Sequence, residues 1–318
     1  MRSGRAPASF ANSVGAVRLS VRLPLCLGLA GALLSSAVLA QSDQNASDAE
    51  PVGDIVVTGR AEAPPTQSEV TRQARSITVP GALRREALPR FQGDRLCPGI
   101  SGLSVGDATL MIDRIRQNAQ DLGLWMTEDD GTCEANFVVA FVDDGQATIR
   151  AIKESRHWLF RDMPYHELRE LMAEEGPVRV WTATVTRTRD GLPAGSSQWM
   201  ASSRIYLAMR EDIVWVLVLF DREDSQGKTL MQLADYATMR GLARTRPVDS
   251  GGKAMDTILA LFDEEGAPPL AMTEFDRAYL GAIYDGLPNM PGITKVLGVN
   301  RQLNRQAAKE RAEDRTKP

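Results

Sequence analysis

The feature that most constrains the fold is an unbroken apolar run at residues 213–220, with the sequence IVWVLVLF. The run is shorter than the roughly 20 residues that a membrane-spanning helix needs. It is rich in β-branched and aromatic side chains, which is typical of a strand buried on both faces of a sheet. We therefore expect a central strand around which the domain is built.

A helix is expected directly after this strand, at residues 230–243, beyond a polar turn at residues 221–228. Thr229 is placed to cap the helix, and Gln232, three residues later, completes a capping-box pattern. Apolar and small residues recur along the segment at helical spacing, so one face is expected to pack on the sheet. Pro247 follows and limits the length of the helix.

Helices and strands are mixed along the remaining chain without strict alternation. Further helices are expected after an Asp107 cap and at residues 147–160, 165–174, 255–262 and 273–284, and further strands at residues 136–142, 178–188 and 202–209. The strand at 202–209 is expected to pair antiparallel with the strand at 178–188. The predicted class is α+β, with a mixed β-sheet packed by helices.

The first 40 residues differ from the rest of the chain. Arginines precede an apolar segment at residues 23–34, and small residues follow as far as Ala40. This order predicts a secretory signal peptide cleaved after Ala40, with a retained anchor or a transit peptide as alternatives. We expect a periplasmic or secreted protein with no transmembrane span after cleavage.

Charge argues against nucleic acid as a partner. The chain has a formal net charge of −4, and the leader contributes only arginines, so the mature chain is still more acidic. No basic stripe with interleaved aromatic residues is present. Residues 250–253, SGGK, lack the spacing of a phosphate-binding loop, and we predict no cofactor.

Three further regions are expected after the leader. Residues 41–94 are polar and contain several prolines, which predicts a flexible arm or linker. Residues 95–297 are predicted to form a single α+β domain. Residues 298–318 are almost wholly polar or charged and are expected to fray.

Cys97 and Cys133 are the two cysteines that remain after cleavage. A pair of cysteines in an exported chain favours a disulfide over a metal site, because two residues cannot complete a four-ligand zinc site. The alternative is two unpaired thiols.

A short β-forming run lies within the predicted arm, at Ile55, Val56, Val57 and Thr58. With its neighbours it resembles the amino-terminal box of TonB-dependent outer-membrane receptors, which pairs as a strand with the energy-transducing partner. The resemblance implies a Gram-negative setting and a partner-binding role for these four residues. The alternative is an ordinary β-forming segment of the arm.

The order of elements in residues 213–286 carries a second resemblance. A strand is followed by a helix that ends in Gly241-Leu242, and a closing helix lies in residues 272–286, MTEFDRAYLGAIYDG. This order resembles zincin-type metallopeptidases of the metzincin kind. The resemblance implies a zincin-like scaffold.

The zinc-binding motif of that family is missing. Aligning Gly241-Leu242 with the family's Gly-Leu puts Ala234, Asp235 and Thr238 at the positions of His-Glu-x-x-His. A shift by one residue puts Asp235, Tyr236 and Met239 there instead. Neither register contains a histidine, so the resemblance implies a scaffold without zinc, with Asp235 as a residual general base at most.

The two histidines of the chain are His157 and His166. His166, Glu167 and Glu170 form an imidazole and carboxylate cluster on an expected helix, and His157 could complete it. The alternative is a solvated, charged helix face.

Two functions follow from these observations. The first is an exported, non-catalytic binding or structural module, a pseudoenzyme that holds a peptide or protein of the cell envelope in its cleft or along a strand edge. The second is a hydrolase with an unconventional site around His166 and Glu170.

Overall fold

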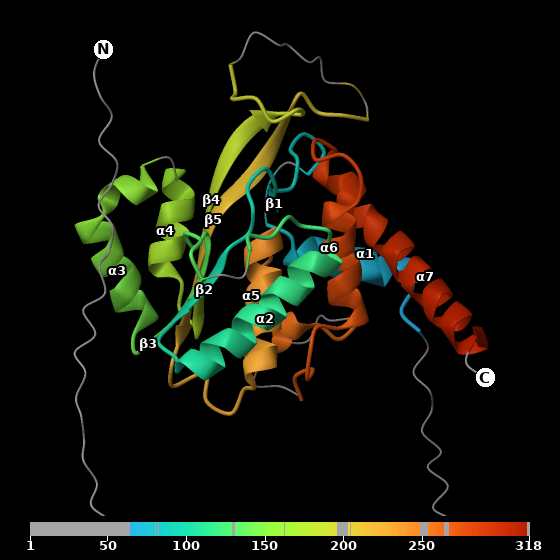
Figure 1. Ribbon diagram of the computed structural model, residues 1–318. Coiled ribbons are helices and arrows are strands. Elements are labelled where there is room, and N and C mark those ends of the chain that lie inside the picture. Colours follow the sequence, from blue (N-terminus) through green and yellow to red (C-terminus); the bar gives the residue numbers. More distant parts are fainter. Residues whose placement is uncertain are drawn as a thin grey trace, which may run out of the picture. The chain divides into compact units, whose positions relative to one another are not determined.

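The apolar run forms the centre of a longer strand, β5 (Met209–Asp221), in the middle of the sheet (Figure 1). β5 pairs in parallel with β3 (Phe137–Val142), and β3 pairs in parallel with β2 (Pro98–Ser101). β4 (Val178–Thr188) pairs antiparallel with β5 along the other edge of β5. The expected mixed sheet packed by helices is confirmed, and most of its pairings are parallel.

The structure is a computed structural model that describes residues 64–79, 81, 83–128, 131–161, 163–195, 203, 205–248, 254–263 and 267–316. These residues belong to a unit that begins at Ala61. The expected signal peptide and the run from Ile55 to Thr58 lie outside the described residues. Among the described residues, no helix is both long and apolar enough to cross a bilayer.

Helices cover both faces of the sheet. They are α1 (Gln67–Ile77), α2 (Val105–Asp121), α3 (Gly145–Ser155), α4 (Tyr165–Ala173), α5 (Leu230–Ala243), α6 (Glu274–Tyr284) and α7 (Gly292–Thr316), with 3-10 turns η1 (His157–Phe160) and η2 (Ile258–Ala260). Figure 1 shows α3 and α4 on one side of the sheet and α2, α5 and α6 on the other.

The alternation of side chains along β5 explains these two layers. Val216, Val218 and Phe220 belong to the larger apolar core, beneath α2, α5 and α6. Leu217 and Leu219 belong to the smaller core, beneath α3 and α4. A stretch of strand that buries both faces is apolar at every position, as residues 213–220 of β5 are.

Several local signals predicted the structure correctly. Thr229 and Gln232 form the expected capping box of α5, and Thr273 and Asp276 form another at the start of α6. The expected disulfide between Cys97 and Cys133 is also present.

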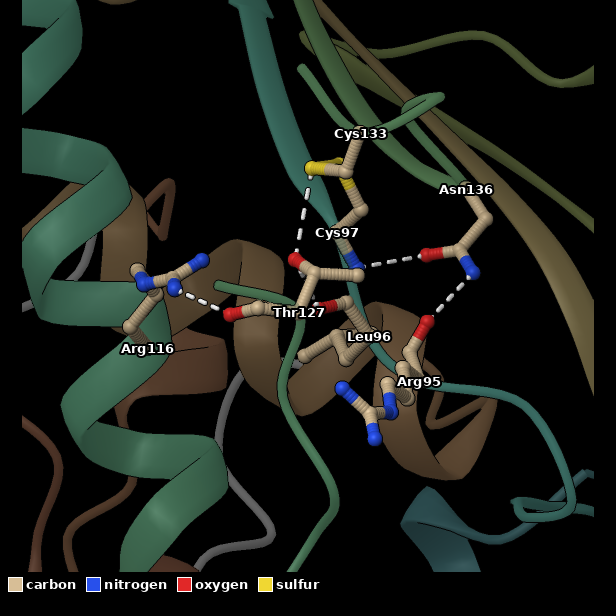
Figure 2. Close-up of a disulfide and its surroundings, with 7 residues drawn as sticks. All are labelled: Arg95, Leu96, Cys97, Arg116, Thr127, Cys133 and Asn136. Carbon is tan, nitrogen blue, oxygen red and sulfur yellow. Dashed lines mark hydrogen bonds between the residues drawn. A yellow bond between two sulfur atoms is a disulfide. The ribbon is translucent and has the colours of Figure 1, made fainter. Parts of the chain in front are cut away.

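Figure 2 shows how the disulfide is surrounded. The side-chain oxygen of Asn136 accepts a hydrogen bond from the backbone N–H of Cys97 at 2.8 Å, and the hydroxyl of Thr127 lies 3.3 Å from Cys133 Sγ. The disulfide therefore joins the residue just before β2 to the segment that precedes β3.

The prediction of a strand at residues 202–209 is wrong. β4 pairs instead with β5 itself, from Thr188 opposite Met209 to Val178 opposite Phe220, and residues 203 and 205–208 form no strand. The polar residues at 210–212 interrupt the apolar pattern, so the sequence predicted a strand that started at Ile213.

Three helix boundaries also differ from expectation. Ser104, not Asp107, caps α2. The Ser104 hydroxyl accepts a hydrogen bond from the backbone N–H of Asp107. The expected helix at 147–160 is divided at Arg156 into α3 and η1. In the segment 255–262 only η2 is helical.

The domain includes parts of both regions expected to lie outside it. α1 buries Val70, Ala74 and Ile77 in the larger core, and β1 (Arg90–Phe91) pairs with β5 at Asp212 and Ile213. At the other end, α7 continues to Thr316 and buries Val299. Both helices bury a narrow apolar stripe within a polar sequence, which composition alone does not reveal.

Candidate functional site

A groove runs along the free edge of β4. Two adjoining cavities of about 700 and 350 Å³ share Glu174, Arg240 and Pro247 in their linings. Val180 and Thr182 line the larger cavity, and Val178 lines the smaller one. The groove is therefore bounded by an edge strand of the sheet.

Backbone groups of β4 point into the open side. The N–H of Asp221 donates to the carbonyl of Pro177 at 2.9 Å, which makes this a hydrogen-bonded pair of the antiparallel ladder. Bonded and non-bonded pairs alternate in such a ladder. The N–H and C=O groups of Val178, Val180 and Thr182 thus face away from β5, and β5 is the one strand paired with β4 among the described residues.

The two walls of the groove have opposite charges. The first wall is α4 and the residues after it, with carboxylates at Glu167, Glu170 and Glu174. The second wall is the end of α5 and the segment after it, with guanidinium groups at Arg240, Arg244 and Arg246.

Two ion pairs join these walls. Arg244 Nη2 lies 3.0 Å from Glu167 Oε2, and Arg240 Nη2 lies 3.5 Å from Glu174 Oε1. Burial raises the pKa of Glu174 above its ordinary value, and the facing Arg240 acts in the opposite direction. The Nε of Arg240 is buried and has no hydrogen-bond partner among the described residues.

In the described part of the chain, Arg244 is the one non-glycine residue with a positive φ, which is 48°. This left-handed conformation ends α5 and is unfavourable for a long side chain. The segment that follows is held in place because the N–H of Arg246 donates to the carbonyl of Ile77 at 2.8 Å. The basic wall thus has a defined backbone.

The imidazole and carboxylate cluster expected from the sequence lies in this groove. His166, Glu167 and Glu170 all line the larger cavity, and His166 is exposed. His157 lies in η1 and is not among the residues that line either cavity. In the part of the chain that the structure describes, no group of three or more His, Cys, Asp or Glu residues is placed to hold a metal ion.

The positions aligned with the zincin motif lie elsewhere. Ala234, Asp235 and Thr238 are fully buried. Asp235 accepts hydrogen bonds from Arg114 Nε at 2.6 Å, Arg114 Nη2 at 2.8 Å, Asn118 Nδ2 at 2.8 Å and the Met272 N–H at 2.7 Å. Both oxygens of Asp235 are therefore engaged in holding α5 to α2 and to the start of the α6 region.

The α5 side chains that do face the groove are Tyr236 and Arg240, four residues apart. The Tyr236 hydroxyl accepts a hydrogen bond from Arg240 Nη1 at 2.8 Å. From the sequence, Tyr236 was expected at a motif position only in the shifted register, and Arg240 was not expected to be a site residue. The repetition of arginine at 240, 244 and 246 was the signal that could have drawn attention to this wall.

This arrangement presents hydrogen-bonding backbone and charges of both signs to a ligand. A ligand in extended conformation could add to the sheet through its main chain and place its side chains against the two walls. Comparison with known proteins adds no assignment, because no protein-family model, no curated protein and no solved structure matches the chain.

Proposed function

We propose that this protein is an exported, non-catalytic module of the cell envelope that binds an extended peptide segment of a partner protein. The segment adds as a strand to the free edge of β4. The observation that carries the proposal is the outward-facing backbone of Val178, Val180 and Thr182 within a lined groove. Exposed strand edges are a recurrent means of peptide recognition, and proteins otherwise cover or charge them.

The charged walls support a peptide ligand of mixed charge. Acidic and basic groups already pair across the groove, so a ligand must replace these contacts with its own or fit between them. A uniformly charged segment would match one wall and be repelled by the other. We therefore expect the bound segment to carry both signs of charge.

The zincin-like scaffold and the exported location belong to the same proposal. The resemblance of residues 213–286, the absence of histidine from α5 and the disulfide support it. A role of Ile55 to Thr58 in binding a TonB-type partner is a separate hypothesis, which a pull-down with and without these residues would test.

A proline substitution tests the strand-addition mode. Thr182→Pro removes an N–H that faces the groove, whereas Thr182→Val keeps that N–H and removes only the hydroxyl. A peptide selected from a random linear display library on the full chain would serve as the probe, with its affinity measured by fluorescence polarisation. We expect Thr182→Pro to weaken binding at least tenfold and Thr182→Val to change it less than threefold.

Circular dichroism would confirm that both variants are folded. If no peptide is enriched, or if Thr182→Pro binds as tightly as wild type, strand addition at β4 is excluded.

The alternative function is a hydrolase that uses His166, Glu167 and Glu170, because these residues share the groove with Glu174, whose pKa burial raises. Elemental mass spectrometry on protein purified without an affinity metal discriminates between the two. About one zinc per chain, together with hydrolytic activity that His166→Ala abolishes, would replace the binding proposal by the enzyme.

A further inference from the structure

Another cavity, of about 420 Å³, lies away from the groove, beside the first residues of β5. Its lining comes from residues 90–94, from residues 122–125 after α2, and from Asp190, Arg210 and Tyr284. A volume in this range is typical of sites for small molecules. None of these residues lines the β4 groove.

The guanidinium group of Arg90 is buried beside this cavity, and its hydrogen-bond partners are neutral. Its Nε donates to Gln92 Oε1 at 2.6 Å, and its Nη1 donates to the carbonyls of Tyr284 at 3.0 Å and Gly286 at 3.2 Å. No carboxylate lies within 4.0 Å of Arg90 in the part of the chain that the structure describes. Such a charge is costly unless an anion compensates it.

Arg210 is the second buried guanidinium of the lining. Its Nη2 donates to Asp212 Oδ2 at 2.8 Å, so its charge is paired. Its Nε is buried and lacks a hydrogen-bond partner among the described residues, and the same is true of Asp212 Oδ1. Arg187 Nε lies 3.5 Å from the same Asp212 oxygen, so the one carboxylate of Asp212 faces three guanidinium groups, and the cluster has an excess of positive charge and an unused donor.

The other charged groups of the lining do not compensate this excess. Asp94 and Asp190 are both exposed, and Asp190 pairs with Arg189 at 3.0 Å. Water screens exposed carboxylates from charges that lie deeper. Lys295, which is buried nearby and influenced electrostatically by Arg90, adds a further positive charge when it is protonated.

Apolar groups complete the cavity. Phe91, Leu122, Leu124, Trp125 and Tyr284 contribute to its lining. Trp125 is 74% exposed, which is unusual for so large an apolar side chain. Its segment is held to the β2 region because the Leu96 N–H donates to the Trp125 carbonyl at 2.8 Å, next to the Cys97–Cys133 disulfide.

We propose that this cavity binds a small organic carboxylate with an aromatic or aliphatic body. The carboxylate pairs with the guanidinium group of Arg90, and the body packs against Trp125 and the neighbouring apolar side chains. The excess of positive charge around Arg90 favours an anion, and guanidinium N–H groups form strong hydrogen bonds with a carboxylate. The apolar lining favours an organic anion over inorganic phosphate.

Benzoate is the probe, titrated into the full chain with its tryptophan indoles labelled with ¹⁵N. Trp125→Phe and Trp158→Phe assign the two indole signals; Trp158 is 57% exposed and lies outside the cavity. We expect a saturable shift of the Trp125 signal and no shift of the Trp158 signal. Benzamide, the neutral analogue, and inorganic phosphate at equal concentration are expected to cause no saturable shift.

Two variants locate the interaction. Arg90→Gln removes the charge and keeps donors for the carbonyls, and it is expected to weaken benzoate binding at least tenfold. Trp125→Ala alters an exposed side chain and is expected to weaken benzoate binding several-fold even if Arg90→Gln fails to fold; because this variant lacks the reporter indole, its affinity and that of wild type are compared by titration calorimetry.

The proposal is overturned if benzoate gives no saturable shift, if benzamide or phosphate acts equally, or if both tryptophan signals move together. It is also overturned if benzoate binds the Trp125→Ala variant as tightly as wild type.

Discussion

Two completely buried carboxylates beside arginines, Asp235 on α5 and Asp212 on β5, have contrasting surroundings. Both oxygens of Asp235 accept hydrogen bonds, from Arg114, Asn118 and the Met272 backbone. Asp212 Oδ2 contacts Arg210 at 2.8 Å and Arg187 at 3.5 Å, while Oδ1 has no partner among the described residues. Burial raises the pKa of Asp212 above its ordinary value.

The difference separates structural polar groups from groups available to a ligand. A buried carboxylate with every acceptor used holds elements together and has no free lone pair for chemistry. A cluster beside a cavity that keeps an unpartnered polar atom or an unpaired charge can still interact with a bound molecule. By this criterion Asp235, although aligned with the zincin motif, is structural.

The largest expected effect is that of Asp235→Asn. The new amide nitrogen would face donors on Arg114, Asn118 or Met272 and leave buried groups unsatisfied. We expect a loss of about 3–5 kcal/mol in the free energy of unfolding, measured by urea denaturation.

Asp212→Asn is the matched control for this substitution. Its amide nitrogen can occupy the position of the unpartnered Oδ1 while the hydrogen bond from Arg210 is kept, and the remaining cost is the lost negative charge, so we expect a smaller loss of about 1–3 kcal/mol. Equal losses for the two variants would contradict the contrast. A stable, fully folded Asp235→Asn protein would restore Asp235 as a possible general base.

The disulfide sharpens the comparison, because it secures the segment that carries Trp125 beside the incompletely satisfied cluster. Replacing Cys97 and Cys133 by alanine removes a crosslink between residues 36 apart. We expect a loss of about 3–4 kcal/mol in stability and weaker benzoate binding, measured by denaturation and by the indole signal of Trp125.

Asn136→Ala removes noncovalent contacts at the same place and is expected to cost about 1–2 kcal/mol. If the two changes cost the same, the crosslink contributes nothing of its own.

The pH dependence of stability tests the buried environment of Lys295 near Arg90. Burial first, and then repulsion by Arg90, lowers the pKa of Lys295 from 10.5 to about 8. The protonated form is disfavoured in the folded state, so the folded protein carries this penalty fully below pH 8. The penalty disappears as the pH rises from about 8 toward 10.5.

Wild type should therefore gain about 1–2 kcal/mol in stability relative to Lys295→Met between pH 7.5 and 9.5, in urea denaturation at each pH. Parallel pH profiles for the two proteins would contradict a lowered pKa of Lys295 in the folded protein.

Local signals accounted for much of the architecture. The buried strand at the centre of β5, the Thr229 capping box and the disulfide were all predicted, because each depends on neighbouring residues or on pairing by elimination. The polar start of β5 at Arg210 and Asp212 was missed because these side chains are buried only through contacts with other elements. The same reason hid α1 and the extension of α7.

The candidate site was predicted in part. His166, Glu167 and Glu170 do line the groove, but the facing wall at Arg240 and Arg244 comes from residues at least 70 positions away. Arg90 was missed entirely, because its burial depends on carbonyls near residue 284. Sequence spacing reports which residues share one helix face and says nothing about which element lies opposite.

By itself, the sequence determined the central buried strand and the helix capped after it, and it favoured the pairing of Cys97 with Cys133. Tertiary structure alone decided that Asp235 is a structural carboxylate, that the edge of β4 opens into a groove, and that Arg90 lacks a charged partner. The physical reason is that the energy of a polar group depends on its burial and partners, and those partners are brought together only when the chain folds.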